Sequence, residues 1–138
     1  MNKIYVLDAC AMLAFLQDEF GADKVVAVLM NARDGKCKVH MNVVNLVEVY
    51  YDIYRAVGAT KANEEIAMIK KLPLVIQTEI TDRIFEEAGR LKASYKISFA
   101  DSFALAQAIV IDGELLTSDH HEFDVIEGKE PVRFQWIR

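Results

Sequence analysis

The sequence predicts an α/β protein, specifically a three-layer α/β/α sandwich around a mainly parallel sheet. Short apolar runs alternate with helical segments along the whole chain, which is the pattern of this architecture. The first run, Ile4–Leu7, is apolar at every position, as is typical of a strand covered on both faces. No repeat, linker or low-complexity segment interrupts the pattern, so residues 1–138 are expected to form a single domain.

The elements follow from apolar periodicity and from capping residues. The first strand ends at Asp8, and the apolar run that follows predicts a helix over 9–16. Asn42, Thr81 and Ser98 are N-cap residues, while Gly58 and Pro73 stop the helices before them. Further helices are expected at 22–33, 43–57, 60–71, 82–95 and 99–112, and further strands at 37–41, 74–76, 114–117 and 134–137.

Composition limits the class of protein. At 53% hydrophobic and 27% charged residues, the 138-residue chain is expected to be globular, with a core that needs no disulfide. The longest uncharged runs are about half the ~20 residues that a bilayer crossing requires, so we expect a cytoplasmic protein with no membrane span. Cys10 and Cys37 have no metal-site spacing and are expected to be free thiols.

The formal net charge of −5 argues against a broad basic surface for nucleic acid, because such surfaces rely on many Lys and Arg contacts to phosphate. Any contact with RNA or DNA is therefore expected to be local or assisted by a metal ion.

Four acids are candidate functional residues, and each also has a structural explanation. Asp8 and Asp119 follow strands, where Asp also serves as an N-cap or a turn former. Asp101 is the third residue of an almost wholly apolar helix, where an acid suits a capping box. Glu48 lies on a long helix and could simply be solvated. Taken one at a time, these residues leave both explanations open.

Taken together, the acids predict a metal centre. The carboxyl ends of parallel strands and the helix N-termini beside them share one sheet edge, so Asp8, Asp101 and Asp119 are expected to converge there. Such a cluster is unfavourable without a cation, and oxygen ligands select Mg²⁺ or Mn²⁺. An ion of this kind neutralises a phosphodiester and lowers the pKa of a bound water, so no histidine base is required. His120 and His121 are expected at the surface.

The helix over 43–57 makes a further prediction. Asn45, Glu48, Asp52 and Arg55 recur at helical spacing and are expected to form one polar stripe. The apolar positions of the same helix are expected to face the core: Val43, Leu46, Val47, Tyr50, Ile53, Tyr54 and Val57. The same helix contains Tyr50, Tyr51 and Tyr54. We therefore expect it to leave apolar surface exposed, which a homodimer would cover.

Four motifs in order resemble those of PIN-domain ribonucleases, and the length is most similar to VapC-type toxins of toxin-antitoxin modules. The motifs are Val6-Leu7-Asp8, Asn45-Leu46-Val47-Glu48, Phe99-Ala100-Asp101-Ser102, and Leu115-Leu116-Thr117-Ser118-Asp119 followed by Phe123. The resemblance implies Mg²⁺- or Mn²⁺-dependent cleavage of single-stranded RNA, with Asp8, Glu48, Asp101 and Asp119 as the acidic site. It also implies a homodimer inhibited by an antitoxin protein. Many family members carry a hydroxyl residue where this chain has Asn45.

Three other classes of protein are alternatives. A receiver-like phosphoacceptor domain needs paired acids after its first strand and an Asp ending a central strand, but Leu7 precedes Asp8 and the strand over 37–41 runs into Asn42. A haloacid-dehalogenase-type phosphatase needs a second Asp two residues after the first, where this chain has Cys10. A PIN-like scaffold that only binds another protein stays open, although four intact acids argue against it.

Overall fold

Five strands and seven helices make up the part of the chain that the computed structural model describes, residues 3–138. The strands are β1 Lys3–Leu7, β2 Cys37–Asn42, β3 Val75–Gln77, β4 Glu114–Thr117 and β5 Arg133–Trp136. The helices are α1 Ala9–Leu16, α2 Ala22–Arg33, α3 Val43–Val57, α4 Ala59–Ile69, α5 Asp82–Ser94, α6 Phe99–Ile111 and α7 His120–Phe123.

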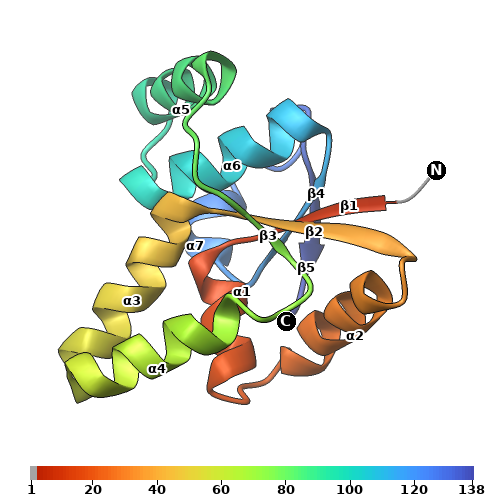
Figure 1. Cartoon of the computed structure of the whole chain (residues 1–138). Coiled ribbons are helices and arrows are strands. Elements are labelled where there is room, and N and C mark those ends of the chain that lie inside the picture. The colour runs from red at the N-terminus through yellow and green to blue at the C-terminus, as the bar shows by residue number, and fades with distance from the viewer. Residues whose placement is uncertain (1–2) are drawn as a thin grey trace.

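The strands form one parallel sheet in the order β3-β2-β1-β4-β5 (Figure 1). β1 is central, and it pairs with β2 on one side and with β4 on the other, with Leu7 opposite Leu116. The carboxyl ends of β1 and β4 therefore meet at the same edge. The chain order reverses around β1, which is where ligands bind in sheets of this kind.

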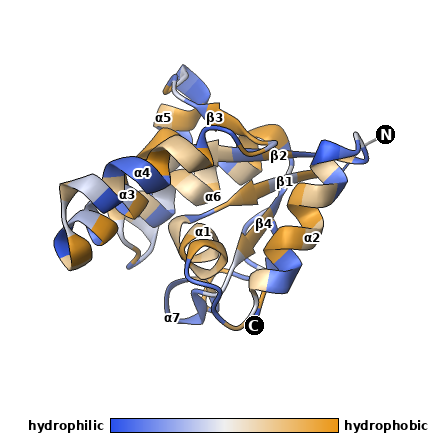
Figure 2. Cartoon of the chain, turned by 60° about the horizontal axis from the view of Figure 1, so that its bottom comes forward, coloured by the Kyte–Doolittle hydropathy of each residue, from blue (hydrophilic) through white to orange (hydrophobic). Residues whose placement is uncertain are grey.

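Helices cover both faces of the sheet, which confirms the predicted three-layer architecture. α1 and α2 lie on one side of the sheet and α5 and α6 on the other (Figure 1). Leu7 on β1 packs in the core shared with α1 to α4, whereas its neighbour Val6 packs in the core shared with α5 and α6. Successive residues of a strand point to opposite faces, so β1 contributes to both cores and is buried at Val6 and Leu7. In Figure 2, β1 appears as a hydrophobic strand between the two helical layers.

The predicted elements are all present, with ends displaced by one or two residues, but α7 was not predicted. Helix α7 has only four residues, which is too short for a helical period to be seen in the sequence. The helix caps are as predicted: Asn42, Thr81 and Ser98 accept hydrogen bonds from the first turns of α3, α5 and α6. Cys10 and Cys37 are free thiols, as predicted. Within residues 3–138, no helix has the length and apolar character that crossing a membrane would require.

The predicted polar stripe of α3 is wrong in part. Asn45 is fully buried, because its side-chain NH₂ group donates a hydrogen bond to the Ala100 carbonyl at 3.0 Å. Val47, Tyr54 and Val57, which were expected to face the core, are 55%, 51% and 64% exposed. The buried face of α3 is rotated toward α4 and α6, which pack against it from two sides.

Candidate metal centre

The acidic site lies at the sheet edge where β1 and β4 end. Asp8 follows β1 directly, and Asp119 follows β4 after one intervening residue. Asp101 occupies the first turn of α6, and Glu48 lies on α3. Three helix N-termini, those of α1, α6 and α7, begin at this edge, and their exposed N–H groups favour negative charge beside them.

Asp8 is buried and uses both carboxylate oxygens. Its Oδ1 accepts a hydrogen bond from the Ala11 N–H at 2.8 Å and so caps α1. Its Oδ2 accepts a hydrogen bond from the Thr117 hydroxyl at 2.5 Å, and the oxygen of that hydroxyl accepts one from the Asp119 N–H at 3.0 Å. The N-cap explanation of Asp8 is thus correct in geometry, yet the same carboxylate is tied through Thr117 to the second strand-end acid.

Asp101, Asp119 and Glu122 form the tightest cluster. Each offers a carboxylate oxygen, and these three atoms lie within 4.8 Å of one another. Asp101 is only 6% exposed, whereas Asp119 and Glu122 are partly exposed. The structure therefore brings together two of the four predicted acids with one that was not predicted.

Glu122 was missed because the stretch over 118–122 is a polar run with no periodicity. A signal was nevertheless present, since Asp119 and Glu122 have the three-residue spacing of a helix cap and its acidic partner. The structure uses that spacing: Asp119 Oδ1 accepts a hydrogen bond from the Glu122 N–H at 3.1 Å. The resulting turn of helix directs Glu122 to the cluster.

Asp8 and Glu48 interact electrostatically with the acids of this cluster. The pKa of Asp8 is raised from its ordinary value of 3.8 to about 7. Burial is the main cause, the charges of Asp119 and Glu48 add to it, and the hydrogen bonds from Thr117 and Ala11 oppose it. Burial raises the pKa of Glu48 as well, with added contributions from Asp52, Asp119 and Glu122. Each of the four predicted acids therefore interacts electrostatically with at least one of the others, although only Asp101 and Asp119 belong to the tightest group.

The pKa of Asp101 is also raised, first by burial and then by the charges of Asp8 and Asp119. Asp101 sits at the third position of α6, whose N-cap Ser98 accepts a hydrogen bond from the Asp101 N–H at 3.1 Å. The backbone of Asp101 thus has a capping role while its carboxylate faces other acids. Nearby, burial and the charges of Asp8, Asp119, Asp101 and Glu48 raise the pKa of the Cys10 thiol, which places that thiol beside the cluster.

The donor set fits a hard divalent cation. Three carboxylate oxygens at this separation repel one another unless a cation lies among them, and an all-oxygen site suits Mg²⁺ or Mn²⁺. The histidines are directed elsewhere. His120 and His121 are exposed, as predicted, and His120 stacks on Trp136 with ring centroids 3.8 Å apart while its ring nitrogens face Asp124 and the Arg138 carbonyl.

The fold and the cluster define a class: parallel α/β proteins with a carboxylate site at the carboxyl edge of the sheet, where the strand order reverses. Within that class the family is shown by sequence. The PIN-domain family model matches residues 5–129, and the chain belongs to the PIN-domain family. No curated protein matches the chain in sequence.

Solved structures share the fold at low identity. VapBC2 from Rickettsia felis bound to a promoter DNA fragment matches with a TM-score of 0.75 at 15% identity, covering 96% of this chain and 98% of that one. DNA-bound VapBC from Salmonella typhimurium matches with a TM-score of 0.75 at 13% identity over 100% of both chains. The sarcin-ricin loop cleaving toxin VapC20 from Mycobacterium tuberculosis matches with a TM-score of 0.62 at 18% identity, covering 94% and 98%. These likenesses establish a VapC-type fold.

Proposed function

We propose that the protein is a Mg²⁺- or Mn²⁺-dependent endoribonuclease that cleaves single-stranded RNA. One observation carries the proposal: Asp101, Asp119 and Glu122 present carboxylate oxygens within 4.8 Å of one another, with the buried Asp8 tied to them through Thr117. Membership of the PIN-domain family and the likeness to a toxin that cleaves the sarcin-ricin loop support this assignment.

The proposed ligands are Asp8, Asp101, Asp119 and Glu122, with Glu48 at the edge of the site. When bound, the ion would neutralise the phosphodiester and lower the pKa of a water molecule. The protein would hold the acidic side chains in position around the ion. Thr117 holds Asp8 and the Asp119 backbone in register, and Asn45 ties α3 to the start of α6, which fixes the separation of Glu48 from Asp101.

We further propose that the protein is the toxin of a toxin-antitoxin pair in the cytoplasm. Support comes from the similar structures, which include VapBC complexes from Rickettsia felis, Salmonella typhimurium and Haemophilus influenzae. The partner would be an antitoxin protein that inhibits the acidic site. Co-expression with the product of a short neighbouring gene, followed by co-purification and loss of cleavage, tests this part.

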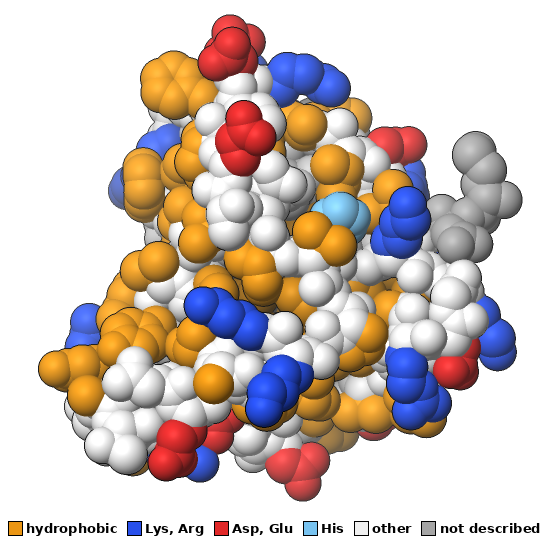
Figure 3. Space-filling model, in the orientation of Figure 1, with side chains coloured by type: hydrophobic (Ala, Val, Ile, Leu, Met, Phe, Trp, Pro, Cys, Tyr) orange, Lys and Arg blue, Asp and Glu red, His pale blue; other side chains and the backbone are white. Residues whose placement is uncertain are grey.

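A homodimer is proposed on separate grounds. Tyr54 and Val57 at the end of α3 are 51% and 64% exposed, and large apolar side chains that lie together at a surface are a common site of association between copies. Figure 3 shows hydrophobic side chains gathered on the left of the molecule. Light scattering at tens of micromolar should give twice the 15.6 kDa chain mass, and a monomer would contradict the proposal.

The central experiment is cleavage of an unstructured RNA by purified protein in Mg²⁺ or Mn²⁺, and chelation should abolish it. Asp101→Asn and Glu122→Gln should each remove activity, whereas Asp82→Asn, an exposed acid in the first turn of α5, should leave it unchanged. Activity that survives excess chelator would refute the metal-dependent mechanism. Phosphoryl transfer to Asp8 would instead favour a phosphoacceptor domain.

A further inference from the structure

A groove continues from the acidic site across the surface between α3 and the start of α6. It has a volume of about 350 Å³ and is lined by Val44, Val47, Glu48, Tyr51, Ser98, Phe99 and Ala100. Its walls are mainly apolar, and its size falls within the ~300–1,000 Å³ range of small-molecule sites. Glu48 belongs both to this groove and to the group of interacting acids, so the groove opens directly beside the proposed metal centre.

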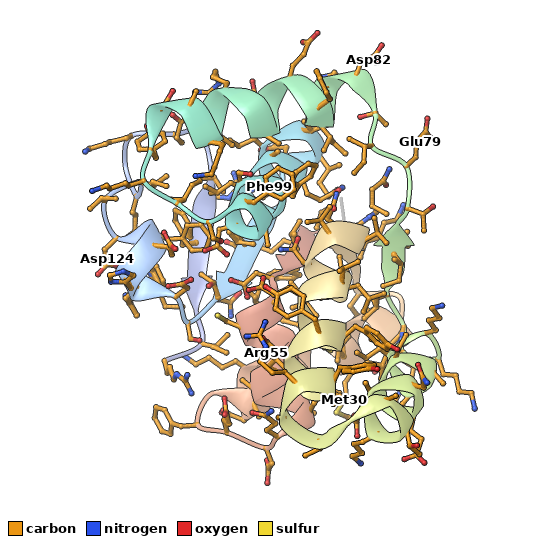
Figure 4. All side chains as sticks on the ribbon, turned by 90° about the vertical axis from the view of Figure 1, so that its left-hand side faces the viewer. Met30, Arg55, Glu79, Asp82, Phe99 and Asp124 are labelled. Carbon is orange, nitrogen blue, oxygen red and sulfur yellow. The ribbon has the colours of Figure 1, made fainter. Side chains whose placement is uncertain are left out.

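Two aromatic rings flank this groove. Phe99 is 64% exposed although it is an apolar residue, and it lies two positions before Asp101. Its ring rests edge-on against Phe103 with centroids 5.0 Å apart, which holds it in place. Tyr51 is 42% exposed, and the Arg55 guanidinium lies 5.3 Å from its ring centroid. Figure 4, which looks at this face, shows Phe99 at the start of α6 and Arg55 further along α3.

We propose that this groove receives one unpaired nucleobase of the RNA strand, next to the phosphate that is cleaved, with Phe99 and Tyr51 as its stacking surfaces. The proposal rests on the proposed ribonuclease function. Single-stranded nucleic acids are bound by aromatic rings on which bases stack, together with cations that meet the backbone. Phe99 and Tyr51 supply the rings, and Arg55 supplies a cation beside them on a chain whose net charge is −5.

The composition of the groove favours a base over a second copy of the chain. An apolar protein surface seated there would bury the Glu48 carboxylate without a partner, which is costly. A nucleobase has apolar faces for Phe99 and Tyr51 and N–H groups along its edge that can meet a carboxylate or water. A strand whose phosphate lies among Asp101, Asp119 and Glu122 would also place a neighbouring base within reach of the groove.

The test combines base deletion with side-chain substitution. An RNA oligonucleotide that the parent cleaves at one bond is prepared as a series, each with a single abasic nucleotide. At one position beside the cleaved bond, base removal should lower kcat/KM by about 5- to 150-fold, the range that corresponds to stacking one base on an aromatic ring. In Phe99→Leu this loss should be at least several-fold smaller, because the base then has only the Tyr51 ring to stack on, and Phe99→Tyr should restore it.

Phe20→Leu is the matched control, since Phe20 is also an exposed phenylalanine but lies just before α2, outside this groove. It should leave the dependence on the base unchanged. The thermal stabilisation by Mg²⁺ or Mn²⁺ should be the same in Phe99→Leu as in the parent, which would show that the acidic site is intact. Light scattering of each variant reports whether Phe99 instead belongs to an interface between copies.

A second arm does not depend on cleavage. Oligonucleotides carrying 2-aminopurine are bound in Ca²⁺, and stacking in the groove should quench the fluorescence of one position more strongly in the parent than in Phe99→Leu. Quenching without cleavage would support the base site and refute the nuclease. Cleavage with no position-dependent loss, or a change of oligomeric state as the sole effect of Phe99→Leu, would overturn the base site and leave the nuclease standing. Neither cleavage nor quenching would overturn both.

Discussion

Neutralising Asp101 should stabilise the metal-free protein, although a substitution in a helix cap usually does the opposite. In Asp101→Asn the Ser98 hydroxyl keeps its hydrogen bond from the backbone N–H of residue 101, so only the side-chain part of the cap is lost. Loss of that part and of the acid at the helix N-terminus costs about 0.5–1 kcal/mol. Removal of a carboxylate that faces two others acts in the opposite direction.

The distances set the size of that opposing effect. Two full charges 4.8 Å apart repel by about 3.5 kcal/mol at an effective dielectric of 20, and Asp101 has both Asp119 and Glu122 within that distance. Both neighbours are partly exposed, so solvent reduces each repulsion. We expect a net gain in the free energy of unfolding of about 2 kcal/mol, which for a chain of this length is a rise in Tm of about 5–8 °C.

The gain should depend on pH in a defined direction. Because the pKa of Asp101 is raised in the fold, the folded parent holds a proton that the unfolded chain releases above its ordinary pKa of 3.8. The parent therefore loses stability relative to Asp101→Asn as pH increases from about 4, and the difference levels off once Asp101 ionises in the folded protein. Melting curves in chelator at pH 5 and pH 8.5 should show the larger gain at the higher pH.

Metal should reverse the order of stability. Mg²⁺ or Mn²⁺ binds the folded parent and raises its Tm, and Asp101→Asn should lose most of this increase. Asp82→Asn is the matched control, because Asp82 occupies the first turn of α5, is exposed and lies outside the cluster. If Asp101→Asn lowers the Tm at both pH values and keeps the full response to metal, Asp101 is a structural cap and the reasoning is refuted.

Three other predictions concern the surroundings of the site. In chelator, the stability measured by urea unfolding should fall from pH 4 to pH 7 as the buried Asp8 is forced to ionise. The difference between 3.8 and about 7, at about 1.4 kcal/mol per pH unit, corresponds to about 4 kcal/mol, and Asp8→Asn should flatten this decline. Thr117→Val should cost about 1–3 kcal/mol because the Asp8 Oδ2 and the Asp119 N–H lose their shared partner, and Thr117→Ser should restore most of it; equal stabilities of the Val and Ser variants would contradict this role. Arg90→Ala should cost about 1–2 kcal/mol, because it removes the ion pairs to Glu130 at 2.7 Å, whose side chain is only 8% exposed, and to Glu87 at 2.8 Å. A cost that does not shrink in high salt would show that packing is responsible.

The order of elements could be predicted from the sequence because each long element has its own pattern of apolar residues, and most helices have a capping residue. Ile4–Leu7 is apolar at every position, and Ser98 stands just before a helix that is buried along most of its length. These are local properties, so they are readable without the partner elements. α7 has a single turn and no apolar stripe, and only its N-cap Asp119 could have indicated it.

The convergence of Asp8, Asp101 and Asp119 could also be predicted, since the carboxyl ends of parallel strands share an edge. The rotation of α3 could not. Helical spacing predicts which residues share a face of a helix but not which face is buried. The face of α3 that is buried depends on the packing of α4 and α6 against it. Asn45 is buried because it meets the Ala100 carbonyl, a contact that joins positions 55 residues apart. Glu122 was missed for a local reason, because the single turn of α7 that directs it to Asp101 shows no helical period and only the spacing from Asp119 indicated it.

The place of β4 in the sheet sets the order in which the site can be completed during synthesis. Asp8 leaves the ribosome early, but its partner Thr117 and the acids Asp119 and Glu122 are added more than a hundred residues later. Until β5 is made, β4 has β1 on one side only. The nascent chain therefore carries Asp8, and later Glu48 and Asp101, before the residues that gather them are made. Under the proposed function, the enzyme would in this way stay inactive while the ribosome is still making it.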